Sequence, residues 1–212
     1  AATFPELTDR TVVFAAPASH TASAIGWSHI QRRAIAIGGD DGLEIARMVA
    51  MMTYRTAGEF EARFGREKNP DGAFWMESYL TRHGEKLRAR FDVDSYLTLL
   101  DTMDGHDVGR GRGGVEAALA PVAQRLVGVG IPGDLLYREE DVLAWVEPIG
   151  AEYRQVHPRP RRVSARARSG IADSYGRFEQ RRGTARRATS GSLRIGGTLR
   201  SAEPILMLPE RV

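Results

Sequence analysis

The chain has 212 residues, 42% of them apolar, which is enough for one folded domain, and it has no cysteine, which excludes disulfides and thiolate metal sites. Residues 1–157 carry 17 Lys and Arg against 23 Asp and Glu, a net charge of −6, whereas residues 158–212 carry 13 Arg and 4 acids, a net charge of +9. No apolar run approaches the roughly 20 residues that span a bilayer, and the first residues do not form a signal peptide. The first part has the pattern of a folded enzyme, and the second has the composition of a segment without a core.

Three short apolar runs are typical of parallel β-strands. Residues 11–16 and residues 125–131 are continuous β-rich runs that end in Pro and Gly, and residues 153–157 form a weaker third run. The continuous apolar character of the first run predicts a strand that is buried on both faces. Apolar residues recur at helical spacing over residues 139–146, so the last two strands are expected to belong to a β-α-β unit with a right-handed crossover.

Helical periodicity dominates the stretch between the first two strands. It predicts helices over residues 42–53, 74–81, 84–91 and 95–103. A parallel α/β sheet with a helical lid over its carboxyl edge is the simplest architecture for this order of elements.

The predicted organisation has four parts. Residues 1–35 hold a sheet strand and the start of the lid, and residues 36–114 form the helical lid. Residues 115–157 continue the sheet core, and residues 158–212 form a basic tail of low order.

A series of strings along residues 4–157 matches one enzyme family in the family's own order. The strings are Phe4-Pro5-Glu6-Leu7-x-Asp9-Arg10, Ile30-Gln31-Arg32-Arg33-Ala34-Ile35, Gly42-Leu43-Glu44-Ile45-Ala46-Arg47-Met48, Met52-Thr53-Tyr54-Arg55-Thr56, Arg63-Phe64-Gly65-Arg66, Glu77-Ser78-Tyr79-Leu80, Arg90-Phe91-Asp92-x-Asp94-Ser95-Tyr96-Leu97, Met103-Asp104-x-His106-Asp107-Val108 and Gly130-Ile131-x-x-Asp134. With these strings the chain resembles the C-terminal half of the homoserine O-acetyltransferases, which are acyltransferases with the α/β-hydrolase fold.

The resemblance implies a reaction and its participants. A serine on a strand-to-helix elbow takes an acyl group from acetyl-coenzyme A and passes it to the hydroxyl of an amino acid, in service of methionine biosynthesis. Acetyl-coenzyme A is then a co-substrate, with no bound cofactor and no metal. The resemblance also implies a cytoplasmic enzyme without a membrane partner, and a possible homodimer through residues 43–103 of the lid.

Two residues are candidates for the site, again by resemblance. Asp134 follows the strand over residues 125–131 and matches the aspartate of the catalytic triad, whose role is to orient the histidine. Its alternative role is a loop aspartate that caps the next helix. Arg47 matches the arginine that binds the substrate carboxylate, and its alternative is a lid arginine in an ion pair. Tyr54 and Arg55 are assigned to lid packing and surface charge.

Four histidines are assigned structural roles: His20, His29, His83 and His106.

Two members of the triad are missing from the sequence. No Gly-x-Ser-x-Gly elbow occurs, so the resemblance places the nucleophile upstream of Ala1 and predicts an N-terminally truncated, inactive chain. The family's Gly-His-Asp-Ala-Phe-Leu motif is expected where residues 158–164 read Pro-Arg-Pro-Arg-Arg-Val-Ser. One permitted back-translation of those residues yields that motif in another frame. We therefore hypothesise that residues 158–212 are translated out of frame.

Three other interpretations remain open. Family members that accept serine, or that use a succinyl donor, share much of this lid. A non-catalytic relative could use its Arg-rich tail to attract nucleic acid. The tail has only Tyr175 and Phe178 as aromatic residues and no RGG repeats, so this role is disfavoured. A retired enzyme that serves as a partner subunit is the third, and an exposed strand edge would make it prone to association.

Overall fold

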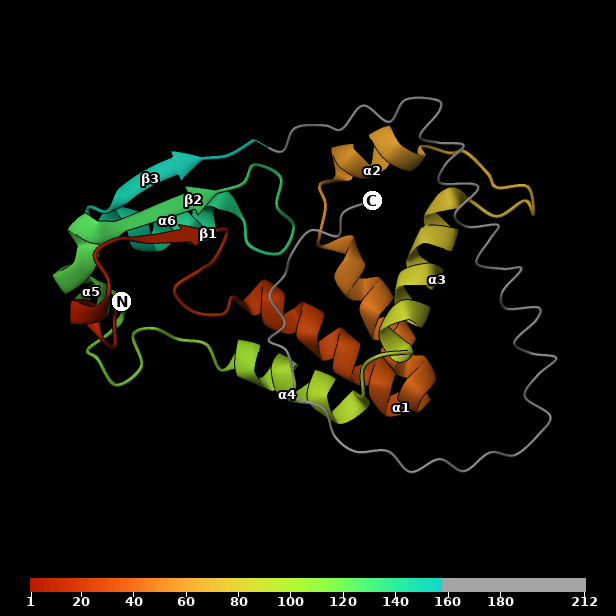
Figure 1. Ribbon diagram of the computed structural model, residues 1–212, viewed down its shortest axis with the longest axis horizontal. Helices are drawn as coiled ribbons and strands as arrows, with labels where there is room; N and C mark the ends of the chain where they lie inside the picture. The colour runs from red at the N-terminus through yellow and green to blue at the C-terminus, as the bar shows by residue number, and fades with distance from the viewer. Residues whose placement is uncertain (158–212) are drawn as a thin grey trace. The chain divides into compact units, whose positions relative to one another are not determined.

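A parallel three-stranded sheet organises the fold. The computed structural model describes residues 1–157, in which β1 (Thr11–Phe14), β2 (Leu126–Gly130) and β3 (Glu152–Gln155) lie side by side in that order (Figure 1). Both pairings are parallel, with Val13 opposite Gly128 and Gly128 opposite Tyr153. The three predicted strands are therefore confirmed.

The central strand β2 is buried along its whole length, and a helix packs directly on one face of its backbone. A Cβ atom on Gly128 would lie 2.4 Å from Val146 Cγ2, so only glycine allows α6 (Glu139–Ile149) to approach this closely. Since α6 connects β2 to the parallel strand β3, the predicted β-α-β unit is confirmed.

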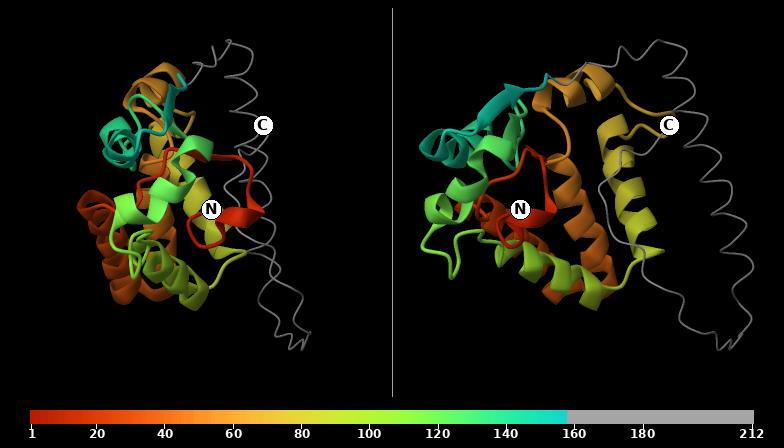
Figure 2. Two further views of the ribbon diagram at one scale, coloured as in Figure 1. Left: turned by 90° about the vertical axis from the view of Figure 1, so that its left-hand side faces the viewer. Right: turned by 60° about the vertical axis from the view of Figure 1, so that its left-hand side comes forward.

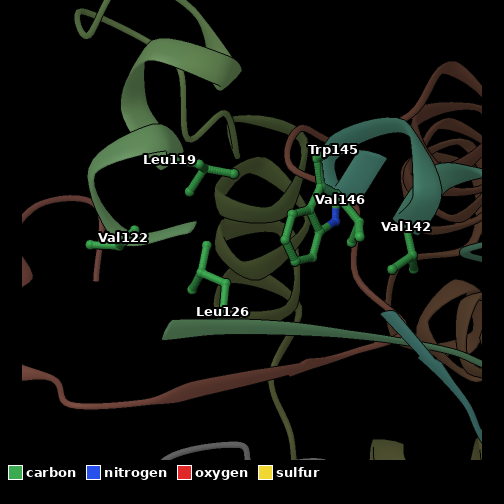
Figure 3. Close-up of a cluster of buried hydrophobic side chains, with 6 residues drawn as sticks. All are labelled: Leu119, Val122, Leu126, Val142, Trp145 and Val146. Carbon is green, nitrogen blue, oxygen red and sulfur yellow. The ribbon is translucent and has the colours of Figure 1, made fainter. Parts of the chain in front are cut away.

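The core of the sheet lies between β2, α6 and two short helices, α5 (Val115–Leu119) and η2 (Ala120–Arg125). Figure 3 shows its six buried side chains, Leu119, Val122, Leu126, Val142, Trp145 and Val146. The indole of Trp145 also donates a 3.0 Å hydrogen bond from Nε1 to the Ala16 carbonyl, which joins α6 to the chain that leaves β1. Burial of these side chains fixes the helix layer on one face of the sheet.

The prediction that β1 is buried on both faces is wrong. Val13 packs against the core cluster, but Val12 is 48% exposed and Phe14 is 61% exposed. The reason is that α5, η2 and α6 cover a single face of the sheet. Within residues 1–157, β2 is the only strand that pairs with β1.

Four helices separate β1 from α5 along the chain. They are α1 (Ala22–Met52), α2 (Ala57–Phe64), α3 (Trp75–Arg88) and α4 (Val93–Asp104). Hydrogen bonds to capping side chains explain where three of these helices begin. Thr21 accepts a hydrogen bond from the Ala24 amide, Thr56 and Glu59 form a capping box, and Asp92 accepts from the Ser95 amide. A short 3-10 helix, η1 (Pro5–Leu7), precedes β1.

The helices of the lid are longer than their predicted segments. The predicted segments 74–81 and 84–91 largely form one helix, α3. Gly84 does not end this helix but lies within it, where α3 contacts α1. The predicted segment 42–53 is the second half of α1, which starts at Ala22 and is kinked at Gly39, where φ is 53°. The boundary expected between residues 35 and 36 lies close to this kink.

Helices α1 and α3 form the centre of the lid and lie against each other (Figures 1 and 2). Two clusters of buried side chains join them. The first contains Ile35, Leu43, Ala46 and Leu87, and the second contains Met51, Phe64 and Tyr79. The lid thus has a core of its own.

The two chain segments that connect the lid to the sheet are hydrogen-bonded to each other. The His20 amide donates to the His106 carbonyl at 2.9 Å, and the Val108 amide donates to the Ala18 carbonyl at 2.9 Å. Ser19 and Asp107 form an antiparallel bridge between them. These bonds hold the start and the end of the lid together.

The basic tail over residues 158–212, and with it the frame hypothesis, lies outside the described residues. Among the helices that the structure does describe, none is both long and apolar enough to cross a membrane.

The close contact at Gly84 gives a test of the lid packing. A Cβ at this position would lie 2.8 Å from the Glu44 carbonyl oxygen and 3.1 Å from Met48 Cε. We expect Gly84→Ala to lower the free energy of unfolding by roughly 1–3 kcal/mol, measured by urea denaturation. Gly58→Ala is the matched control, because its Cβ would meet nothing within 4 Å, and it should be neutral or stabilising. Equal effects of the two changes would contradict the packing.

Candidate functional site

Asp134 lies in the loop that follows β2 and organises that loop. Its Oδ1 accepts hydrogen bonds from the backbone amides of Leu136, at 2.8 Å, and Tyr137, at 2.9 Å. Among residues 1–157 its Oδ2 has no hydrogen-bond partner. The cap of α6 is provided instead by Asp141, whose Oδ2 accepts from the Arg138 amide at 2.9 Å. Asp134 is therefore a loop aspartate that keeps one oxygen available, and its triad role stays a prediction.

Arg47 lies on α1 and contacts an aromatic side chain rather than a carboxylate. Its Nη1 donates a 2.8 Å hydrogen bond to the Tyr54 hydroxyl, and its guanidinium lies 4.9 Å from the centre of the Tyr54 ring. Within residues 1–157 Arg47 forms no ion pair with an acidic side chain. A half-buried guanidinium that is not neutralised by the protein is suited to bind a carboxylate from a ligand.

Tyr54 is more exposed than its predicted packing role implies. It is 43% exposed, and its hydroxyl accepts a hydrogen bond from Arg47. The phenol proton is not used in that bond, so the hydroxyl can donate to the same ligand group that Arg47 binds. Tyr54 lies just beyond the end of α1 at Met52, so helical spacing alone does not place it beside Arg47.

A partly buried hydrogen bond links α1 to α4 near this pair. The Tyr96 hydroxyl donates to Gln31 Oε1 at 2.5 Å, and Gln31 Nε2 donates to the Trp27 carbonyl at 3.1 Å. Burial raises the pKa of the Tyr96 phenol to about 12, with a further increase from Tyr54 and an opposing effect of Arg47. Tyr96 therefore stays neutral and keeps its donor role through the physiological pH range.

The loop of Asp134 meets the lid close to Tyr54. Gly133 has a φ of 79°, and a Cβ on it would lie 3.2 Å from Thr56 Cγ2. Thr56 is the N-cap of α2 and follows Tyr54 by two residues. The structure thus brings the loop that carries Asp134 to the same sheet–lid junction as the segment that carries Tyr54.

A pocket of about 150 Å³ lies between the chain that follows β1, the end of α4 and Tyr137 of the loop after β2. Its walls are Ala16, Pro17, His20, Met103, His106 and Tyr137. Most of this wall is apolar.

The buried side chain of His20 bridges the lid and the Asp134 loop. His20 Nδ1 lies 2.5 Å from the Met103 carbonyl oxygen, so this nitrogen donates the bond. The His20 ring meets the Tyr137 ring edge-on, with 5.8 Å between the ring centres. Burial raises the pKa of Tyr137, and the carboxylates of Asp134 and Asp104 add to this shift. His20 therefore connects α4 to the loop after β2.

Within the described part of the chain, no group of three or more His, Asp or Glu side chains is arranged to hold a metal ion. No residue is therefore assigned to a metal.

No family model matches this chain, but known proteins match about two thirds of it. The homoserine O-acetyltransferase of Thermobifida fusca is 43% identical over 160 residues, covering 65% of this chain and 42% of the relative. The homoserine O-acetyltransferase of Thermus thermophilus is 42% identical over 162 residues, covering 72% of this chain and 41% of the relative. The chain is a homologue of the homoserine O-acetyltransferases. It spans less than half the length of these two relatives.

Solved structures agree with this assignment. A homoserine O-acetyltransferase from Staphylococcus aureus has 28% sequence identity and a TM-score of 0.59, covering 82% of this chain and 49% of that one. A homoserine O-acetyltransferase from Bacillus anthracis has a TM-score of 0.65 at 13% identity, covering 82% of this chain and 55% of that one, and supports the fold alone. The predicted α/β-hydrolase fold with its parallel sheet is therefore confirmed.

The two hydrogen bonds to Asp134 predict a difference between two substitutions. Asp134→Asn keeps a carbonyl oxygen at Oδ1, so the loop and the stability of the chain should change by less than about 0.5 kcal/mol. Asp134→Ala leaves both backbone amides without this acceptor and should cost about 1–2 kcal/mol in urea denaturation. Equal losses in both variants would show that the negative charge, rather than the turn, matters for folding.

The raised pKa of Tyr96 predicts a loss of stability at high pH. In the unfolded chain the phenol ionises near pH 10, whereas in the folded chain it stays protonated until about pH 12. Its contribution to stability is thus complete below pH 10 and is lost as the pH rises toward 12. We expect Tyr96→Phe to show a smaller fall of the unfolding free energy between pH 9 and 11 than the unmodified chain. An identical pH dependence would contradict the burial of this phenol.

Proposed function

We propose that residues 4–157 form the lid and part of the active site of a homoserine O-acetyltransferase that acts in methionine biosynthesis. The observation that carries the proposal is the match at 43% identity to an enzyme of that name, over 65% of this chain. The names of the matched relatives favour homoserine over serine as the acceptor and acetyl over succinyl as the donor.

The proposed reaction has two steps. The hydroxyl of a serine attacks the thioester carbonyl of acetyl-coenzyme A, forms an ester with the acetyl group and releases the coenzyme A thiol. The hydroxyl of homoserine then attacks this ester, giving O-acetylhomoserine and regenerating the serine. A histidine takes up and returns the proton in each step. Acetyl-coenzyme A is a co-substrate in this scheme, and no bound cofactor takes part.

The residues of this chain would orient the histidine and bind the acceptor substrate. Asp134, through its available oxygen, would hold the histidine in the correct tautomer and stabilise its protonated form. Arg47 would bind the carboxylate of homoserine, and the Tyr54 hydroxyl would donate to the same group. The nucleophilic serine has no Gly-x-Ser-x-Gly motif in the 212 residues, and neither it nor the histidine is assigned to a residue here. The 212-residue chain by itself is accordingly expected to be inactive.

We also propose a cytoplasmic location, which is consistent with acetyl-coenzyme A and homoserine as substrates. A homodimer through residues 43–103 is supported by an exposed apolar side chain on α1, Ile45, which is 51% exposed. The alternative of a non-catalytic relative that attracts nucleic acid rests on the tail, which lies beyond the described residues.

A chimeric enzyme tests the proposed function. The matching stretch of the Thermobifida fusca enzyme is replaced by residues 4–157, so that the relative supplies its own N-terminal part and its own C-terminal end. We expect the chimera to release coenzyme A from acetyl-coenzyme A in the presence of L-homoserine and to form O-acetyl-L-homoserine, detected by mass spectrometry. A chimera that folds, as judged by circular dichroism, but forms no product would contradict the proposal. Faster turnover with L-serine or succinyl-coenzyme A would support the alternative acceptor or donor.

Single changes in the chimera separate the roles of the two site residues. Asp134→Asn keeps the loop turn, so a fall in kcat/KM of about a thousandfold or more would reflect the histidine that it no longer orients. Arg47→Gln should lower kcat/KM by about a hundredfold, because the substrate carboxylate loses a charge-assisted bond. Arg33→Gln is the matched control, an exposed arginine on the same helix, and should leave kcat/KM within about twofold. An Arg47→Gln enzyme as active as this control would exclude the carboxylate role.

A further inference from the structure

His20 is a buried histidine that several contacts hold against the end of α4. Its side chain is 3% exposed, and its Nδ1 donates a 2.5 Å hydrogen bond to the Met103 carbonyl oxygen. Its backbone amide donates to the His106 carbonyl at 2.9 Å, and its Nδ1 lies 3.9 Å from Asp104 Oδ1. A ring that is fixed through its backbone and through one ring nitrogen keeps one orientation, so it can support a neighbouring side chain.

Asp104 extends this anchor from α4 to α1. Its Oδ2 lies 2.7 Å from Arg32 Nη1, and Arg32 also donates to Asp101 Oδ1 at 2.8 Å. The side chains of Arg32 and Asp104 are 27% and 19% exposed, so solvent screens this ion pair less than a pair on the surface. His20 is therefore attached to a part of the lid that two helices form together.

Tyr137 carries the contact from His20 to the Asp134 loop. Its ring meets the His20 ring edge-on, with 5.8 Å between the ring centres, and its amide donates to Asp134 Oδ1 at 2.9 Å. Burial raises the pKa of Tyr137, and the carboxylates of Asp134 and Asp104 raise it further, which places the phenol near both of them. One residue therefore contacts Asp134 through its backbone and His20 through its ring.

We propose that His20 is a positioning residue for Asp134. It supports the Tyr137 ring and so holds the loop in the place from which Asp134 Oδ2 reaches the catalytic histidine. A misplacement of about 1 Å in a catalytic group can lower a rate by about a hundredfold, so a support outside the site affects the reaction. This inference rests on the proposed function, because it assumes the triad role of Asp134.

His20 is not placed to be the histidine that Asp134 orients. Within residues 1–157 His20 has no hydrogen bond to Asp134, and its Nδ1, the nitrogen that donates to the aspartate in a triad, donates to the Met103 carbonyl instead. Its Nε2 is buried and has no hydrogen-bond partner in this part of the chain, whereas a general base needs a nitrogen within reach of the reacting proton. Its role is therefore exerted through Tyr137.

The first test follows the loop in the 212-residue chain, without catalysis. His20→Asn keeps an N–H that can donate to the Met103 carbonyl but removes the ring that contacts Tyr137. The amides of Leu136 and Tyr137 are both bonded to Asp134 Oδ1. We expect these two amides to exchange with solvent deuterium at least about tenfold faster in His20→Asn.

The Ser95 amide is the internal control for this exchange measurement. It is bonded to the Asp92 side chain at the start of α4 and should exchange at the same rate in both proteins. Unchanged exchange at Leu136 and Tyr137 in His20→Asn, or an equal acceleration at Ser95, would overturn the proposal.

The second test measures catalysis in the chimeric enzyme. His20→Asn should lower kcat about tenfold and leave KM for L-homoserine within about twofold, because Arg47 and Tyr54 are unchanged. His20→Phe places a ring against Tyr137 again and should recover most of the lost kcat. His29→Asn, at an exposed histidine on α1, is the matched control and should leave kcat unchanged. A kcat of His20→Phe as low as that of His20→Asn, or a change in KM alone, would overturn the proposal.

A double variant separates positioning from a general loss of stability. A chimera with Asp134→Asn has no carboxylate to position, so the addition of His20→Asn should lower kcat/KM by less than about twofold. A general structural role would give the same loss of about tenfold with either residue at position 134. Such additivity would overturn the proposal.

Failure of this inference and failure of the proposed function give different results. An inactive chimera would overturn the proposed function, whereas the exchange of the Leu136 and Tyr137 amides still decides whether His20 holds the loop. An active chimera in which His20→Asn changes neither amide exchange nor kcat would overturn the positioning role alone.

Discussion

The contact between Gly128 and the side chains of α6 is the interaction on which the rest of the structure depends. Because Gly128 has no side chain, Val146 and Val142 rest directly on the backbone of β2, and the strand is buried along its length. The loop that carries Asp134 follows the end of this strand. The same helix reaches β1 through the hydrogen bond from Trp145 to the Ala16 carbonyl. One close approach of helix and strand therefore aligns the sheet with the chain segment that leads to the lid.

The second constraint is the attachment of the lid. The hydrogen bonds between residues 18–20 and residues 106–108 close the lid at its base, and the contact of Gly133 with Thr56 brings the Asp134 loop to the start of α2. Arg47 and Tyr54 belong to the lid, whereas Asp134 belongs to the sheet. A site that combines them therefore depends on both attachments. The reaction proposed for such a site is the one that gives the matched homoserine O-acetyltransferases their name.

Much of the fold could be predicted from the sequence, because apolar periodicity reports local structure directly. The three strands, the β-α-β unit and the helices within the lid follow from it. The exposure of Phe14 could not be predicted, since a continuous apolar run indicates a strand suited to burial but does not reveal whether anything covers it. The merging of two predicted helices at Gly84 depends on a crossing with α1, which is a tertiary contact. Arg47 likewise pairs with Tyr54 at the end of α1, where helical periodicity no longer predicts which side chains meet.

The central claim is that Arg47 and Tyr54 bind the carboxylate of an amino acid while Asp134 orients the catalytic histidine. A crystal structure of the chimeric enzyme with L-homoserine tests this most directly. The account predicts that the carboxylate lies about 3 Å from both the Arg47 guanidinium and the Tyr54 hydroxyl, with Asp134 Oδ2 accepting a hydrogen bond from the histidine ring. A homoserine carboxylate bound elsewhere, with Arg47 still paired only to Tyr54, would contradict the account.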